Sequence, residues 1–538
     1  MPRKLLQFLL VLGFASLFNI LFWQEKAALN LVLFGILLGV AVLRLNRSAI
    51  GRTNVRLTAA GTLLAGLFVL LHASEAARAA FVLSYVSFLG FVYAPALRSL
   101  PASLAISTGN FFAGPFWMAD SLRKIRVERL RRFKLGYYLG IGFIPVLIVG
   151  LFFVIFSAAN PKFGGLFADI GLYLGDFLDT IFTAVSPVRI MFFLFGLYLL
   201  AGIFFFRPFS SLANRDAHAK QTLLRIRKPR MFRSQIPQPR VHRGEGLPPI
   251  PQGYAHPYNP PLVRKGLKTG LRREYRIALL AFGLVNLLAL LNNALDISWI
   301  WFGFEAEPGF SLKQFVHEGT YLLILSILIA MGIMFYFFRG NLNFISENKW
   351  LRYAAYFWIV QNAIMVVSVG IRNYHYISHF GLAYKRIGVY FFLALVLFGL
   401  ITLFLKIRNK KTFYHVVRVN AWAVYAVLLL LATVNWDGFI TRYNISHVPV
   451  ERMDTEFLLH MSDKTLPLLH EHKDELFTDP DKVIRAGGYR GYFTEEEYLE
   501  ERIREATERY QSHSWLSWNF ADAAAMSYFK KHTPDLIQ

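Results

Sequence analysis

The sequence predicts an all-α fold, a polytopic membrane helix bundle of about eleven transmembrane helices followed by a helical extracytoplasmic C-terminal tail. Three observations predict it. Hydrophobic residues make up 55% of the 538 residues and the mean hydropathy is +0.40, which leaves too little polar surface for a soluble chain of this length. Apolar stretches recur at lengths suited to crossing a bilayer. Basic residues gather in every second connection between these stretches.

Most of the apolar stretches approach the ~20 residues that a spanning helix needs. The first follows Arg3 and Lys4, like the start of a signal peptide, but Phe22 to Glu25 offer no small-residue cleavage site, so we expect it to stay as an anchor. The expected spans are Leu5–Trp23, Leu29–Leu43, Leu57–Ala73, Ala79–Leu97, Leu135–Phe156, Ile190–Phe206, Ile277–Leu295, Thr320–Phe338, Tyr353–Ile371, Ile387–Leu405 and Val419–Val434.

The distribution of Lys and Arg predicts the orientation. If the N-terminus is cytoplasmic, the segments on that side carry 38 of the 58 basic residues, the opposite short loops carry 8, and the tail carries 12. Cytoplasmic loops of membrane proteins are enriched in Lys and Arg. We therefore expect a membrane protein with a cytoplasmic N-terminus and an extracytoplasmic C-terminus. The net charge of +24 is explained by these loops, so we expect no nucleic-acid partner.

Four segments are expected along the chain. They are a six-span region (1–206), a basic cytoplasmic loop (207–276), a five-span region (277–439) and the tail (440–538). The loop has nine prolines between Pro229 and Pro261 and too few apolar residues for a core, so we expect a mobile linker. The loop and the tail are the candidate surfaces for a protein partner, and membrane lipids are the expected surroundings.

Three amphipathic stretches lie outside the spans. Phe111–Lys134 reads as a basic helix for an anionic inner leaflet, with a solvated run of charges as the alternative. Lys162–Pro187 reads as an outer amphipathic helix. In the tail we expect one helix that includes Phe457 and Leu469 and another that begins at Thr494. The aromatic group Trp515, Trp518 and Phe520 is apolar enough to contact a partner surface.

The chain carries none of the common catalytic or cofactor signatures. It has no cysteine, which excludes disulfides, thiolate metal sites and cysteine catalysis. It has no serine-hydrolase, phosphate-loop or dinucleotide motif. We therefore assign no cofactor and no metal.

Several strings in the C-terminal membrane half resemble a known family. From Phe315, Trp358, Gly381 and Val434 these strings read FVHEGTYLLILSILIAMGIMFYFFRGNLNF, WIVQNAIMVVSVGIRNYHYI, GLAYKRIGVYFFLALVLFGLITLFLKI and VNWDGFITRYNI. They resemble the DUF4153-like and DUF4173-like bacterial multi-pass membrane proteins of unknown function, and WLSWNFADAAA from Trp515 does so more weakly. The resemblance implies a fold, a topology and a place in a bacterial inner membrane, and it supplies no catalytic residue.

Polar groups at the outer ends of the last five spans are the candidate substrate-binding residues. They come from separate hairpins at similar depth, and ionisable groups at a membrane boundary usually find partners or substrates. The candidates are His317, Glu318, Arg372, Tyr384, Lys385, Arg386 and Asp437. We expect the three basic residues to gather around Glu318 and Asp437, either to hold an anionic headgroup or only to lock the bundle.

Two histidine motifs are weaker candidates, in both cases for a metal site. His317 and Glu318 lack the second histidine of a zinc-protease helix, because Tyr321 takes its place. His375 and His379 have a spacing that can hold a metal, but interfacial histidines are more often only hydrogen-bonded.

Amide side chains lie within two of the expected spans, and such amides most often hold helices together. They are Asn286, Asn292, Asn293, Gln361 and Asn362. The less favoured alternative is that these amides line a translocation path.

Three classes of function remain open. The first is a transporter or lipid-linked export component whose outer face binds an anionic lipid or a lipid-linked substrate. The second is a non-catalytic membrane scaffold or signalling partner. The third is a membrane transferase with Glu318 or Asp437 as its general base. We rank them in this order.

Overall fold

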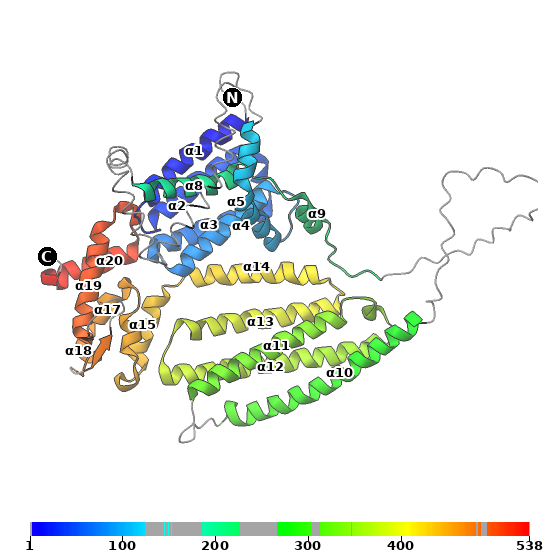
Figure 1. Cartoon of the computed structure of the whole chain (residues 1–538). Coiled ribbons are helices and arrows are strands. Elements are labelled where there is room, and N and C mark those ends of the chain that lie inside the picture. The colour runs from blue at the N-terminus through cyan, green and yellow to red at the C-terminus, as the bar shows by residue number, and fades with distance from the viewer. Residues whose placement is uncertain are drawn as a thin grey trace, which may run out of the picture. The chain divides into compact units, whose positions relative to one another are not determined.

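The computed structural model describes residues 3–123, 145, 149, 152, 186–225, 266–302, 312–345, 347–479, 482–485 and 492–536, with only the backbone for 3, 266–269, 312–318 and 485. Contacts divide the chain into two units (Figure 1). Unit 1 comprises Met1–Ala219, Ile377–Phe391 and Ala421–Gln538, and unit 2 comprises Lys220–Tyr376 and Phe392–Asn420. The tail thus belongs with the N-terminal spans.

Unit 1 contains the helices before the basic loop and the end of the chain. Its N-terminal helices are α1 (Arg3–Phe22), α2 (Leu29–Leu45), α3 (Thr53–His72), α4 (Glu75–Tyr93), α5 (Leu100–Arg123), α8 (Pro187–Phe204) and α9 (Ser210–His218). From Ala421 onwards, α14 (Phe413–Ala432) also belongs to this unit. Its core includes Val11 of α1, Leu38 of α2, Phe88 of α4, Ile106 of α5 and Leu200 of α8.

Unit 2 is built from long apolar helices. They are α10 (Gly266–Asp296), α11 (Leu312–Phe337), α12 (Asn348–Phe380), α13 (Tyr384–Arg408) and the start of α14. Of α12 the unit includes the part up to Tyr376, and of α13 the part from Phe392. A π-helical turn, η3 (Ile297–Trp301), follows α10, and a 3-10 turn, η4 (Asn341–Phe344), follows α11. The ring of Phe282 on α10 packs edge-on against Phe338 and Trp358. This cluster ties α10 to α12 and to the end of α11.

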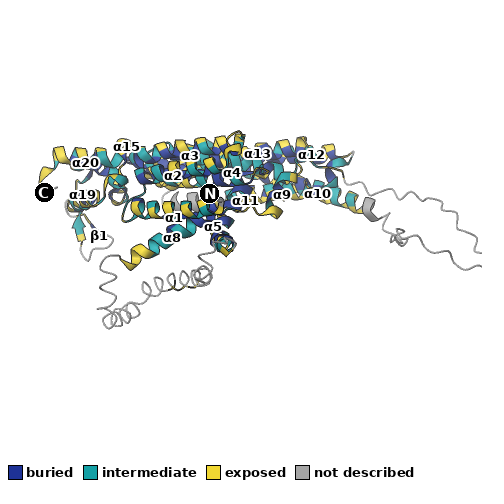
Figure 2. Ribbon diagram, turned by 90° about the horizontal axis from the view of Figure 1, so that it is seen from above, coloured by how far each residue is buried: buried dark blue, intermediate teal, exposed yellow. Residues whose placement is uncertain are grey.

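The helices confirm an all-α polytopic bundle and an integral membrane protein. Within the described residues, nine helices are long and apolar enough to cross a membrane, and they match nine of the eleven expected spans. The expected span at Leu29 is α2, an apolar helix of 17 residues. The span expected at Leu135–Phe156 lies outside the described residues, apart from three isolated positions. Figure 2 shows exposed residues along α8. Large apolar side chains of this helix, such as Val188 and Phe195, are among them, as expected of lipid-facing residues.

Two contacts in unit 1 join helix ends that the charge distribution predicts to lie on the same, inner side of the membrane. Gln7, near the start of α1, donates to the carbonyl oxygen of Phe204 at the end of α8 at 2.7 Å. Arg52, before α3, donates to the carbonyl oxygens of Phe91 and Val92 near the end of α4 at 2.7 and 3.1 Å. The segments expected on the inner side therefore lie together.

Helix α5 includes the first part of the basic helix expected at Phe111–Lys134; the rest of that stretch lies outside the described residues. The carboxylate of Asp216 receives the backbone N–H groups of Arg98 and Ser99, which fixes the chain before α5. Further along, α5 packs on the ends of α4 and α8, where Ser103 donates to the carbonyl oxygen of Ser87 at 2.6 Å. Most of its inward face is buried, so α5 is more than a surface helix.

The tail folds into helices and one small hairpin. It comprises α15 (Trp436–His447), η5 (Val450–Arg452), α16 (Thr455–Leu459), η6 (Asp463–Thr465), α17 (Leu466–Glu471), α18 (Lys473–Leu476), β1 (Val483–Arg485), β2 (Tyr492–Thr494), α19 (Glu495–Ser512), η7 (Trp515–Ser517), α20 (Phe520–His532) and η8 (Pro534–Leu536). The strands are antiparallel, with Val483 opposite Thr494 and Arg485 opposite Tyr492. A shared core joins Leu458, Leu466, Leu499 and Phe529 of the tail to Leu382 between α12 and α13.

One of the two expected tail helices differs from the prediction. The segment from Phe457 to Leu469 is broken into α16 and α17 with η6 between them. Pro467 sits in the first turn of α17, where its missing N–H is harmless, whereas the interior of a longer helix would exclude it. The second expected helix is confirmed as α19, which begins after Thr494 with a capping box between Thr494 and Glu497.

Two other expected features cannot be compared with the structure. The outer helix expected at Lys162–Pro187 lies outside the described residues up to Val185, and its last two residues, Ser186 and Pro187, are the N-cap and the first residue of α8. The proline-rich stretch Pro229–Pro261 of the basic loop lies outside them altogether.

Candidate functional site

Unit 1 contains a large cavity where the ends of membrane helices meet the tail. Its volume is about 1330 Å³. One wall is formed by the α1–α2 and α3–α4 connections and by the starts of α13 and α15, and the other by η6, α19, η7 and α20. We call it the capped cavity. All of the connections that line it are expected on the outer side from the charge distribution.

Aromatic and charged side chains dominate the lining of the capped cavity. The aromatic residues are Tyr384, Trp436, Tyr498, Tyr510, Trp515 and Trp518. The basic residues are Lys26, Arg78, Lys464, Arg502 and Arg509, and the acidic residues are Glu75, Asp437, Asp463, Glu505 and Asp522. The Lys, Arg, Asp and Glu charges therefore balance. Each of these ten residues takes part in an ion pair within the lining.

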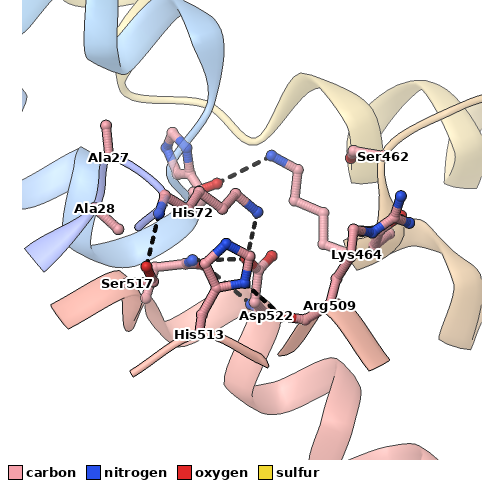
Figure 3. A network of polar contacts seen from close by, with 12 residues as sticks. Ala27, Ala28, His72, Ser462, Lys464, Arg509, His513, Ser517 and Asp522 are labelled. Atoms are coloured by element: carbon pink, nitrogen blue, oxygen red, sulfur yellow. Dashed lines mark hydrogen bonds and ion pairs between the residues drawn. The ribbon is translucent and has the colours of Figure 1, made fainter. Parts of the chain in front are cut away.

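Asp437 is the most heavily bonded carboxylate of the cavity. It receives hydrogen bonds from the hydroxyl of Tyr384 and from the hydroxyl of Ser462, and Lys464 pairs with its Oδ2 at 2.8 Å. Burial raises the pKa of Asp437, but the charge of Lys464 and these hydrogen bonds outweigh burial, so the pKa lies below its ordinary value. The Lys464 ammonium also donates to the carbonyl oxygen of His72 at 3.0 Å, as Figure 3 shows.

A second group of contacts joins the tail to the α1–α2 connection. Lys26 pairs with Asp522 at 2.6 Å, and its backbone N–H donates to the hydroxyl of Ser517 at 2.7 Å (Figure 3). The neighbouring carboxylate of Glu25 accepts from Ser517 and from the backbone N–H of Ser514. Burial raises the pKa of Glu25, but the hydrogen bonds from Ser514 and Ser517 lower it below its ordinary value. The tail therefore covers the helix ends through specific polar contacts.

The start of α4 offers an anion-binding arrangement to the cavity. The backbone turns sharply from α3 into α4 because Ala73 adopts a left-handed conformation, with φ of 42°, and Ser74 then caps α4 by accepting from the N–H of Ala77. Arg78 lies in the next turn and pairs with Glu75 at 2.6 Å, although the side chain of Glu75 is 90% exposed. Nε of Arg78 is buried and has no hydrogen-bond partner among the described residues. A helix N-terminus and a guanidinium both favour anions.

The structure brings two of the expected site residues together. Tyr384 and Asp437 share a hydrogen bond and line the capped cavity. Arg386, in the same unit, donates to the carbonyl oxygens of Phe380 and Gly381, which are close to it in sequence. Lys385 is exposed. Neither Lys385 nor Arg386 is among the basic residues that line the capped cavity.

Arg372 belongs to unit 2, where it pairs with Asp296 at 2.7 Å and both side chains are less than 10% exposed. The sequence analysis did not name Asp296 as a partner. His317 and Glu318 fall on the backbone of α11, and their side chains lie outside the described residues. His375 contacts the carbonyl oxygen of Ile300 at 3.3 Å, and His379 is exposed. Within the described part of the chain, no three His, Asp or Glu residues are grouped to hold a metal.

Amides of the spans hold α10 against α12. Asn293 donates to the backbone and side-chain oxygens of Gln361 at 3.0 and 2.7 Å, and Gln361 donates to the carbonyl oxygen of Asn286 at 3.2 Å. Asn286 in turn donates to the carbonyl oxygen of Ala354 at 3.0 Å. These bonds agree with the expectation that amides in spans hold helices together.

Several cavity residues were missed by sequence reasoning. Lys26 and Arg78 are among only eight basic residues in the outer short loops, so the charge bias itself marked them as exceptions. Lys464 and Asp522 lie in a polar tail with many charges, where nothing in the sequence sets them apart. Only the fold of the tail places them at the helix ends.

Comparison with known proteins identifies one match. The family model for Domain of unknown function (DUF4153) matches residues 32–472. No curated protein and no solved structure matches the chain.

Proposed function

The chain belongs to the DUF4153 family, a domain of unknown function, and we propose that it is a transporter or lipid-linked export component that binds an amphiphilic molecule with an anionic headgroup in the capped cavity. We place it in a bacterial inner membrane, with the cavity on the extracytoplasmic side. Arg78 carries this proposal, because it lines the cavity at the N-terminus of α4 with a buried Nε that has no partner among the described residues.

The electrostatics of Arg78 favour exchange of its partner. Its carboxylate partner, Glu75, is 90% exposed, and exposed ion pairs contribute only about 0–1 kcal/mol. A phosphate or carboxylate of a ligand can therefore replace Glu75 at little cost. The N-terminus of α4, where Glu75 and Ala76 line the cavity, also favours an anion at this position. This site replaces Arg372, Lys385 and Arg386 as our candidate for the anionic group.

The size and lining of the cavity support an amphiphilic ligand. Pockets for small molecules usually measure about 300–1,000 Å³, and this cavity is larger. Six aromatic side chains offer apolar surface beside the charged groups. The cavity also lies at the ends of membrane helices, where a headgroup can enter while its apolar chain stays near the bilayer.

A membrane scaffold is the second candidate, and the ion pairing favours it. Every Lys, Arg, Asp and Glu of the lining is paired, as expected of a tail that is only held in place. The transferase is less well supported, because the lowered pKa of Asp437 and its three hydrogen-bond donors make this carboxylate a weak general base.

Thermal unfolding in detergent with short-chain lipids tests the proposal. Dihexanoyl phosphatidylglycerol should stabilise the protein by about 2.7 kcal/mol at a hundredfold excess over Kd, whereas uncharged dihexanoylglycerol should do so much less. Ala76→Trp, which fills the cavity, should abolish the stabilisation. The matched control is Ala79→Trp on the exposed side of α4.

Arg78→Gln separates binding from folding. It should weaken the response to phosphatidylglycerol while leaving the unliganded protein nearly as stable, because the change removes only an exposed ion pair and a long hydrogen bond of 3.5 Å to the carbonyl oxygen of Ala27. Equal responses of the wild type, Ala76→Trp and Arg78→Gln to the two lipids would contradict the proposal and favour the scaffold.

A further inference from the structure

The tail exposes a group of large aromatic residues at the edge of the capped cavity, and two of them also contribute to its lining. Trp515, Trp518 and Phe520 are 67%, 40% and 60% exposed. We call them the aromatic cluster. Together they expose much apolar surface within a short stretch of an otherwise polar tail, and exposed apolar surface of this kind can mark a contact surface.

Polar contacts fix the aromatic cluster next to the end of a membrane helix. Ser517, which lies between the two tryptophans, accepts from the backbone N–H of Lys26 at 2.7 Å, and Ser514 donates to Glu25. The membrane helix α1 ends at Phe22, only a few residues before these contacts. Helix η7 also packs on the start of the apolar helix α2. The cluster therefore lies close to the boundary of the bilayer.

Neighbouring side chains mark the same boundary. Ile20, in the last turn of α1, is 61% exposed, so the apolar surface of the helix continues to its end. Just beyond it, Arg189 lies over the ring of Trp23 at 5.8 Å from the ring centre, joining the start of α8 to the end of α1. Tryptophan is enriched at this depth because its ring is apolar and its N–H is polar, and basic residues flank it.

We propose that the aromatic cluster inserts into the headgroup region of the leaflet that surrounds the α1–α2 end of the bundle. The occupant of this surface is phospholipid. Lys26 and Arg509, which line the adjoining cavity, are partly exposed, but each is paired with a carboxylate, so the apolar rings and not a net positive charge carry the insertion. Insertion anchors the tail to the membrane as well as to the helix ends. This inference does not depend on a ligand in the cavity.

The absence of cysteine from the chain allows a direct test. The full-length protein with Trp515→Cys carries one thiol, which is labelled with an environment-sensitive fluorophore in phosphatidylcholine nanodiscs. Lipids brominated near the headgroup end of the chain should quench this label, and lipids brominated at the chain terminus should quench it less. Tyr492→Cys is the matched control, because Tyr492 is a tail aromatic, 73% exposed, on the small hairpin.

The outcomes separate the lipid from other occupants. Quenching at 515 without quenching at 492 supports insertion. If the label is quenched at neither position, the proposal is overturned, and the cluster remains a contact surface for a protein. If Trp515→Cys fails to fold, Phe520→Cys provides the same measurement from the other end of the cluster. None of these results depends on whether phosphatidylglycerol stabilises the protein.

Discussion

At the scale of single residues, Lys464 joins three parts of unit 1 through one ammonium group. It pairs with Asp437 of α15 at 2.8 Å and donates to the carbonyl oxygen of His72, the last residue of α3, at 3.0 Å. The side chains of Lys464 and Asp437 are only 7% and 12% exposed. A charge at this depth is stable only while its partner is present.

Lys464→Met should therefore destabilise the protein by about 3–5 kcal/mol, because it leaves the Asp437 carboxylate buried without its counter-charge. Thermal unfolding in detergent measures the change. The double variant Lys464→Met with Asp437→Leu should recover most of the loss. A single variant as stable as the wild type would show that Tyr384 and Ser462 satisfy Asp437 alone.

The sequence was informative about this site in one respect and silent in another. Tyr384 precedes the tenth expected span and Asp437 follows the eleventh, both at the outer side, so hydropathy and charge predicted a similar depth for them, and the two side chains do meet. Their partners Ser462 and Lys464 come from the tail. The tail has no repeating pattern that predicts its path, because its contacts depend on tertiary packing.

At the scale of elements, hydropathy predicted the long apolar helices but gave no signal for the first half of α5, before the amphipathic helix expected from Phe111. Only helices and closed barrels can cross hydrocarbon without losing backbone hydrogen bonds, which is why a simple count of apolar residues works for spans. Helix α5 has polar and small residues such as Ser103, Ser107 and Asn110 on its buried face. Such a face gives no hydropathy signal, although small residues allow close packing of helices.

Gly114 of α5 shows how close this packing is. A Cβ atom at this position would lie 2.2 Å from Cα and 2.4 Å from the backbone nitrogen of Gly202 in α8. Gly114→Ala should therefore destabilise the protein by about 1–3 kcal/mol or more, because the two helices must separate. The loss is measured as a lower unfolding temperature in detergent.

The control for this change is Gly13→Ala in α1, where a Cβ atom would meet nothing within 4 Å. Alanine forms helices better than glycine by up to about 1 kcal/mol, so this variant should be as stable as the wild type or more so. A similar loss in both variants would mean that the α5–α8 contact is not the cause.

At the scale of the whole molecule, the two units do not follow the order of the sequence. The N-terminal spans that the structure describes and the tail form one unit, together with residues from the middle of the C-terminal membrane region. A linear reading of the chain cannot give this grouping, because it depends on contacts between residues hundreds of positions apart. The lining of the capped cavity agrees with the predicted alternation of spans, since the connections expected outside lie together there.

Reporter fusions test the predicted orientation. Because 38 basic residues lie in the segments expected inside and 8 in the outer short loops, a fusion at Pro251 should report a cytoplasmic location and one at His513 an extracytoplasmic location. An enzyme active only in the periplasm and a fluorescent protein active only in the cytoplasm provide complementary readouts. Both fusions on one side would contradict the count of eleven spans.

The pairing of Lys26 with Asp522 joins residues that are 496 positions apart. During synthesis, the α1–α2 connection leaves the ribosome early and its partners Ser514, Ser517 and Asp522 leave it near the end. The wall of the capped cavity that is formed by η7 and α20 therefore cannot exist on a nascent chain. A chain that stops before Ser514 leaves the charged groups of the helix ends uncovered, and the cell's quality control would meet an open bundle.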